Sequence, residues 1–235
     1  MWYPLNKQEL ESFIDKSFKQ KANIKPKKIH GLIVPHAGYE YSGMIAGKAI
    51  SLLRNKKIKK AVVIGPSHYQ SFNNTSTTNK KYFETPLGKI LTFNTDFIQG
   101  DITNEHSINN QIPFLQKLGI KEIMPLMIGE ITDKQAQEIA KKIFKIPAIY
   151  IFSTDLSHFY DYEKAVKTDQ NTIKILENLD FNNFRYVDAC GYFPLLIMMH
   201  LCKIKKTSPR LIEYKNSGDI TGGKSSVVGY CSMRF

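Results

Sequence analysis

The stretch Ala61-Val62-Val63-Ile64-Gly65-Pro66-Ser67-His68 joins a short apolar run to a turn that ends on a histidine. Its first four residues have the length and β-branched character of a buried strand, and Gly65 and Pro66 end that strand. Two other stretches, 33–36 and 151–158, also pass from an apolar run to a histidine. Segments with the apolar spacing of amphipathic helices separate these strands. The alternation predicts an α/β fold with a central mixed, largely parallel sheet flanked by helices.

The chain has enough apolar residues for a single domain. Its 235 residues are 42% hydrophobic, and no repeat or low-complexity linker divides them, so we expect one domain over residues 1–235. The predicted strands are 29–34, 61–64, 123–128, 148–152, 210–214 and 226–233, with an antiparallel hairpin at 82–93. The predicted helices lie within 1–20, 42–53, 107–118, 133–144, 162–179 and 194–204.

The chain is basic, with 33 Lys and Arg against 21 Asp and Glu and a net charge of +12. Such a charge can attract nucleic acid or acidic ligands. The excess is mostly lysine, scattered as at Lys25, Lys27 and Lys57, and no stripe of arginines interleaved with aromatic residues accompanies it. We therefore do not expect nucleic-acid binding.

Membrane and secretory signals are lacking in the sequence. The longest apolar runs, such as 194–199, are far shorter than the roughly 20 residues that span a bilayer. The first ten residues do not have the basic and apolar regions of a signal peptide. Three cysteines, Cys190, Cys202 and Cys231, cannot all pair with one another. We expect a cytoplasmic protein without a membrane association or a disulfide framework.

Three histidines, His36, His68 and His158, each follow an apolar strand. A single histidine at such a place is more often structural than a ligand. Ligands of open α/β sheets bind outside the carboxyl ends of the strands, so three histidines at equivalent positions favour one shared pocket. Two imidazoles need a carboxylate or a thiolate to complete a metal site, and the candidates are Asp155 and Cys190.

Each further candidate residue has a structural alternative. Asp155 precedes His158 by three residues, so a helical turn would place both on one face, where Asp155 would ligate or orient His158; its alternative role is a helix N-cap. Cys190 precedes an apolar helix, where free N–H groups favour a thiolate, although free cysteine is often merely buried. His106 opens the helix at 107–118 as a candidate acid or base, or stands beside a capping Ser107. Cys202 and Cys231 are expected to pack in the core.

Residues 218–225, Gly-Asp-Ile-Thr-Gly-Gly-Lys-Ser, match the phosphate-binding pattern GxxxxGKS. That pattern requires a strand before it and a helix after it, followed by further strands that bind Mg²⁺. Only ten residues follow Ser225, and they have a strand pattern. We expect a glycine turn between the last two strands rather than an NTPase site.

Six separated motifs together resemble the Memo family. They are Pro35-His36-Ala37-Gly38-Tyr39 with Tyr41-Ser42-Gly43, Gly65-Pro66-Ser67-His68, Glu105-His106-Ser107, Ser153-Thr154-Asp155-Leu156-Ser157-His158, Cys190-Gly191 with Pro194, and Ser217-Gly218-Asp219 with Val228-Gly229-Tyr230. The resemblance covers nearly the whole chain. It departs from the family at Asn109, where the family usually has a Glu, so a role for negative charge at the pocket rim is not expected here.

The resemblance implies a fold similar to that of the class III extradiol dioxygenases, which are non-haem iron enzymes. By motif, it assigns His36, His68 and Cys190 to a metal and places His106, Asp155 and His158 along the same pocket as catalytic candidates. It also implies an AMMECR1-like protein and a radical-SAM protein as partners in a three-part system.

Two functions remain open from the sequence. The first is a metal-dependent, dioxygenase-like oxidoreductase that acts on a small molecule, with iron or copper preferred and zinc compatible, because imidazole and thiolate are too soft for Mg²⁺. The second is a non-catalytic module whose pocket binds a peptide or a partner protein. Asn109 and the thiolate at Cys190 favour the second, because both changes could weaken turnover.

Overall fold

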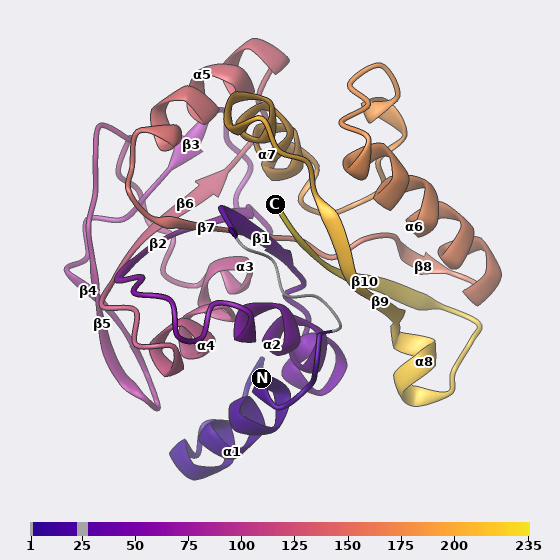
Figure 1. Ribbon diagram of the computed structural model, residues 1–235, viewed down its shortest axis with the longest axis horizontal. Coiled ribbons are helices and arrows are strands. Elements are labelled where there is room, and N and C mark those ends of the chain that lie inside the picture. Colours follow the sequence, from indigo (N-terminus) through magenta and orange to yellow (C-terminus); the bar gives the residue numbers. More distant parts are fainter. Residues whose placement is uncertain (1, 23–27) are drawn as a thin grey trace.

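Five parallel strands form the centre of the sheet in the computed structural model, which describes residues 2–22 and 28–235 (Figure 1). In spatial order they are β5 (Gly88–Thr92), β6 (Glu122–Ile128), β2 (Lys60–Pro66), β7 (Ile149–Ser153) and β1 (Gly31–Val34). Lys25 and Lys27, two of the scattered lysines, lie outside the described residues. The parallel centre and the single α/β unit were both predicted from the sequence.

Antiparallel strands extend the sheet at both edges. β4 (Tyr82–Thr85) pairs with β5 as the predicted hairpin, and the short β3 (Thr75–Ser76) pairs with β6. On the other side, β10 (Val227–Arg234) pairs with β1, and it also pairs with β9 (Arg210–Asn216) and β8 (His158–Tyr160). The mixed character of the ten-stranded sheet therefore comes from its edges.

Helices cover both faces of the sheet. One face carries α1 (Lys7–Phe18), α2 (Met44–Ser51), α3 (His106–Asn109) and α4 (Ile112–Lys117), and the other carries α5 (Asp133–Phe144) and α7 (Tyr192–Lys205) (Figure 1). The remaining helices are α6 (Tyr162–Glu177) and α8 (Ser217–Thr221), with a π-helical turn at Tyr39–Gly43 and a 3₁₀ turn at Phe184–Tyr186.

Successive side chains of β2 lie on opposite faces of the sheet, which explains why the central strands are apolar throughout. Val62 and Ile64 belong to the core cluster on the α5 and α7 side, whereas Ala61 and Val63 belong to the cluster on the α1 and α2 side. A parallel strand that is buried on both faces needs a continuous apolar run. Cys202 and Cys231 are buried in the first of these clusters, as predicted, and all three cysteines are free.

Two predicted segments differ in detail from the observed ones. The helix expected at 107–118 is divided into α3 and α4, because Pro113 in the first turn of α4 has no N–H to continue the bonding of α3. The glycine turn expected after β9 contains α8, which Asn216 and Asp219 cap reciprocally before Gly222 adopts a φ of 83°.

The GxxxxGKS stretch does not have the surroundings of a phosphate-binding loop. A short helix lies within its first half, and strand β10 rather than a helix follows Lys224 and Ser225. No helix N-terminus therefore faces the position that phosphates would occupy. The stretch connects β9 to β10, as predicted, although the connection contains α8 rather than a turn alone.

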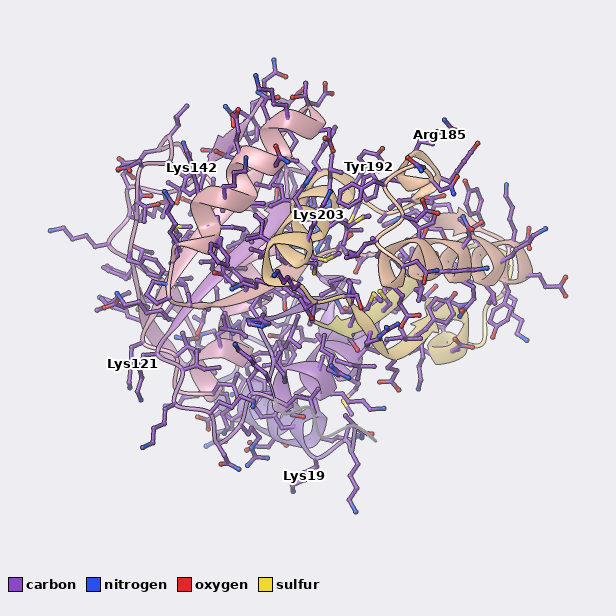
Figure 2. All side chains as sticks on the ribbon, turned by 45° about the horizontal axis from the view of Figure 1, so that its top comes forward. Lys19, Lys121, Lys142, Arg185, Tyr192 and Lys203 are labelled. Atoms are coloured by element: carbon purple, nitrogen blue, oxygen red, sulfur yellow. The ribbon has the colours of Figure 1, made fainter. Side chains whose placement is uncertain are left out.

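Lysine side chains are distributed over many elements rather than gathered in one stripe. Lys19, Lys121, Lys142 and Lys203 are all exposed and lie on separate parts of the surface (Figure 2). Among the described residues, no helix combines the length and the apolarity that crossing a bilayer requires.

Helices α1 and α2 approach each other closely at Gly47. A Cβ added there would collide with the Ser17 side chain and lie 3.1 Å from the Phe114 ring. We expect Gly47→Ala to lower the free energy of unfolding by about 1–3 kcal/mol, because a well-packed contact would be overfilled. Urea unfolding measures this. In the control Gly223→Ala, the new Cβ would lie 3.6 Å from the nearest atom, Thr221 Oγ1, so its stability should remain within about 0.5 kcal/mol of the wild type. Equal stability of the two variants would contradict this packing account.

Candidate metal centre

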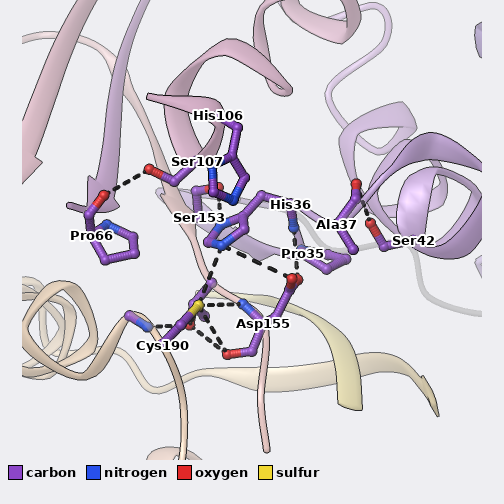
Figure 3. A network of polar contacts seen from close by, with 12 residues as sticks. Pro35, His36, Ala37, Ser42, Pro66, His106, Ser107, Ser153, Asp155 and Cys190 are labelled. Carbon is purple, nitrogen blue, oxygen red and sulfur yellow. Dashed lines mark hydrogen bonds and ion pairs between the residues drawn. The ribbon is translucent and has the colours of Figure 1, made fainter. Parts of the chain in front are cut away.

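Three histidines and one cysteine converge at the carboxyl edge of the parallel strands. His36 follows β1, His68 follows β2, and His106 begins α3. The ring centroids of His36 and His68 lie 5.0 Å apart, and the His106 centroid lies 5.3 Å from the first and 4.2 Å from the second. Cys190, in the turn before α7, places its Sγ 3.3 Å from His36 Nε2 (Figure 3). The fold thus brings these four predicted site residues together.

His36, His68 and Cys190 fit a metal ion. Each offers one ligand atom, and the three atoms all lie within 4.8 Å of one another. In a tetrahedral site with ligand distances of about 2.0–2.3 Å, neighbouring ligand atoms stand roughly 3.5 Å apart. Small side-chain movements would therefore close this group around one ion. Two imidazoles and a thiol suit zinc, iron or copper, and they do not suit magnesium.

Glu105 orients His68, although no role was assigned to it from the sequence. One carboxylate oxygen accepts from His68 Nδ1 at 2.8 Å, and the other accepts from the His68 backbone N–H at 2.8 Å. Glu105 also accepts from the Ser107 N–H at 2.9 Å. Burial raises the pKa of Glu105, but the hydrogen bonds from His68 and Ser107 outweigh it and hold the pKa below its ordinary value. A carboxylate on Nδ1 leaves Nε2 of His68 free for a metal.

His36 is held by an equally complete set of contacts. Its backbone N–H donates to Asp155 Oδ1 at 2.8 Å, and its Nδ1 lies 3.0 Å from Ser153 Oγ. Gln111 Nε2 donates to the same Ser153 Oγ at 3.0 Å. Burial lowers the pKa of His36 well below its ordinary value, and the neighbouring histidines add to the effect. Burial thus favours the neutral imidazole of His36, the form that binds metals.

Two hydrogen bonds, one between backbones and one from a backbone N–H to the sulfur, join Asp155 and Cys190. The Cys190 N–H donates to the Asp155 carbonyl at 3.2 Å, and the Asp155 N–H lies 3.2 Å from Cys190 Sγ. Gly191 follows directly, and its N–H donates to Thr154 Oγ1 at 2.9 Å, where a Cβ would collide. Burial and the Asp155 charge raise the pKa of the Cys190 thiol to about 12. Burial therefore opposes the thiolate that the N–H groups of this turn were predicted to favour, and the thiolate stays a prediction.

The helical turn predicted to join Asp155 to His158 is wrong. Residues 154–157 are irregular, and His158 begins β8. The Thr154 N–H pairs with the Val34 carbonyl, and the Leu156 N–H pairs with the Gly229 carbonyl, so contacts with β1 and β10 replace local helical bonds. Asp155 consequently anchors His36 instead of orienting His158.

His158 lies half-buried near the cluster, outside the group of possible metal ligands. Burial lowers its pKa, with a smaller contribution from the charge of His68. The charge of Asp188 acts in the opposite direction and raises the pKa of His158. Asp188, which was not predicted, is therefore the acidic neighbour of His158.

Aromatic side chains form the rim on the His106 side. The Trp2 ring stacks on the His106 ring at 4.1 Å and 5°, and Tyr69 Oη lies 3.1 Å from His106 Nδ1. Burial and the charge of His68 lower the pKa of His106 to about 4, against the opposing charge of Glu105. Asn109 lies apart from this rim, donating to the Thr103 carbonyl at 2.7 Å. A groove of about 450 Å³ opens beside His68 and Cys190.

The sequence matches the family described as Memo-like protein over residues 1–234. A MEMO1 family protein of Thermoplasma volcanium is 32% identical, covering 99% of this chain and 94% of its own length. A MEMO1 family protein of Methanobrevibacter smithii is 34% identical, covering 100% of this chain and 96% of its own length.

A solved structure shares the fold at much lower identity. An uncharacterized protein of Escherichia coli K12 superposes with a TM-score of 0.55 at 11% identity, covering 88% of this chain and 100% of its own. That likeness concerns the fold alone. The match over the whole length and the identity to full-length relatives show that the chain belongs to the Memo family.

Proposed function

We propose that this Memo-family chain is a cytoplasmic metal-dependent oxidoreductase that binds iron or copper at His36, His68 and Cys190. One observation carries the proposal: three ligand atoms from three separate loops lie within 4.8 Å of one another. Iron and copper accept mixed imidazole and thiolate ligands and change oxidation state, whereas zinc fits the ligands but is not redox-active. A bound ion would supply Lewis acidity and electron transfer toward O₂ and a small-molecule substrate.

The protein's own side chains would hold the ligands and handle protons. Glu105 and Ser153 contact the Nδ1 atoms of His68 and His36, which leaves each Nε2 for the ion. His158 is the candidate general acid or base, because it lies near the cluster without belonging to the ligand group. His106, in contact with Tyr69, is the second candidate for proton transfer. A role for AMMECR1-like and radical-SAM proteins as partners stays a prediction of the family resemblance.

Metal content tests the ligand assignment. We expect protein purified without a histidine tag to retain iron or copper, and the His36→Ala plus His68→Ala variant to lose most of it. Elemental analysis after gel filtration measures the ratio of metal to protein. The matched control is His30→Ala plus His200→Ala, which removes two imidazoles that lie outside the metal-ligand groups. Equal metal content in wild type and both double variants would show that the cluster is not the site.

Oxygen uptake tests catalysis separately from binding. We expect the metal-loaded wild type to consume O₂ with members of a catechol panel, and His158→Ala to keep its metal while turnover falls by about 10²–10⁴-fold, the usual contribution of an acid or base. An oxygen electrode together with metal analysis gives both quantities. Metal-loaded protein that consumes no O₂ with any catechol would contradict this oxidoreductase assignment. The groove of about 450 Å³ beside His68 and Cys190 would then favour a peptide-binding or partner-binding pocket.

A further inference from the structure

A cavity of about 630 Å³ lies at the amino edge of the parallel strands, opposite to the edge that carries the histidine cluster. Its walls are the segments that lead into β1, β2 and β7, together with the C-terminal ends of α5 and α7. We call it the basic pocket, and its cationic and imidazole side chains are His30, Lys57, Lys59, Lys60, Lys145 and Lys205.

Positive charge in the basic pocket is poorly balanced. None of its lining residues is acidic, and Lys60 pairs with Glu122 of β6 at 2.5 Å. The pocket lysines with no carboxylate within ion-pair distance, among the residues that the structure describes, are Lys57, Lys59, Lys145 and Lys205.

Lys205 is fixed at the wall of the basic pocket. Its Nζ lies 4.8 Å from the centroid of the Phe144 ring and 5.1 Å from that of Tyr150. Tyr150 is buried, and its hydroxyl lies 3.0 Å from the carbonyl oxygens of both Ile143 and Ile146, which accept its one hydrogen bond and restrain its ring. Cation–π contacts with these two rings favour the observed position of the Lys205 ammonium group at the pocket wall.

The surroundings of Lys205 disfavour its charged form. Burial and the charge of Lys28 lower its pKa. Burial and the charges of Lys205 and Lys28 likewise lower the pKa of His30. An anion in the basic pocket would relieve this repulsion.

Apolar side chains line the rest of the basic pocket, notably Ile58, Phe144, Ile146 and Pro147. A hollow lined by several lysines and by apolar side chains matches an anion that carries an organic group, and lysines without a carboxylate partner match the double charge of a phosphate. Nucleic acid needs an extended track of charge rather than a hollow. We propose that the basic pocket binds a small organic phosphate, with the phosphate on Lys205 and its neighbouring lysines and the organic group on the apolar floor.

Calorimetric titration with phenyl phosphate and with inorganic phosphate tests this site. We expect phenyl phosphate to bind more tightly than inorganic phosphate, because only the former reaches the apolar floor. Lys205→Met should weaken phenyl phosphate binding about tenfold or more, since it removes a charge-assisted contact. The matched control is Lys203→Met, which makes the same change on the exposed side of α7, outside the basic pocket (Figure 2). It should bind like the wild type.

Two further measurements keep the test decisive. Thermal unfolding should show that Lys205→Met stays folded, with at most the small loss of stability that removing the two cation–π contacts causes, so that weaker binding does not reflect unfolding. Lys145→Gln, a second change on an exposed residue of the pocket, should also weaken binding. Equal affinity for the two phosphates, equal weakening by Lys203→Met and Lys205→Met, or tighter binding of a short DNA duplex than of phenyl phosphate would overturn the proposal. These outcomes do not depend on the metal centre.

Discussion

The parallel register of β1, β7 and β2 is the constraint on which the site depends. Val34 pairs with Ser153, and Ile64 pairs with Phe152, so the three strands end at one level. The loops that follow these strands therefore start side by side. His36 and His68 come from two of these loops. The last residue of β7, Ser153, and Asp155 in the loop that follows it hold His36. A shift of one strand by one residue would turn its side chains to the opposite face and separate the ligands.

Buried carboxylates fix the conformation of the loops that follow the aligned strands. Glu105 and Asp155 each accept the backbone N–H of one histidine, His68 and His36 respectively. Asp169 of α6 accepts the Ser157 N–H and the Tyr214 hydroxyl, where Gly229 permits close approach. Each of these carboxylates accepts backbone N–H groups of an irregular loop. Without the carboxylates, these buried N–H groups would have no hydrogen-bond partner. The same contacts keep the imidazoles oriented without a bound ion.

Local patterns were sufficient to predict the central strands, most helices and a pocket shared by His36, His68 and His158. The family resemblance added Cys190 to the metal ligands and placed His106 along the same pocket. Apolar runs that end in a turn and a histidine are local features, and the parallel fold supplies their convergence. The direction of the Asp155 side chain was predicted wrongly, because pairing of residues 154 and 156 with distant strands overrides the local spacing. Glu105 was missed as an orienting group, although its place directly before His106 at a helix start was a usable signal. The stacking of Trp2 on His106 could not be predicted, because only tertiary packing brings these two residues, far apart in the sequence, into contact.

The central claim is that Cys190 completes a metal site with His36 and His68, and metal protection of its thiol tests this most directly. Mass-spectrometric mapping of alkylation compares the rate at each cysteine with and without bound metal. The account predicts that metal slows the labelling of Cys190. It also predicts that Cys202 and Cys231, which have 0% exposure, react slowly and equally in both forms. Equal labelling of Cys190 in both forms, with metal still bound through His36 and His68, would contradict the thiolate assignment and leave Asp155 as the favoured third ligand.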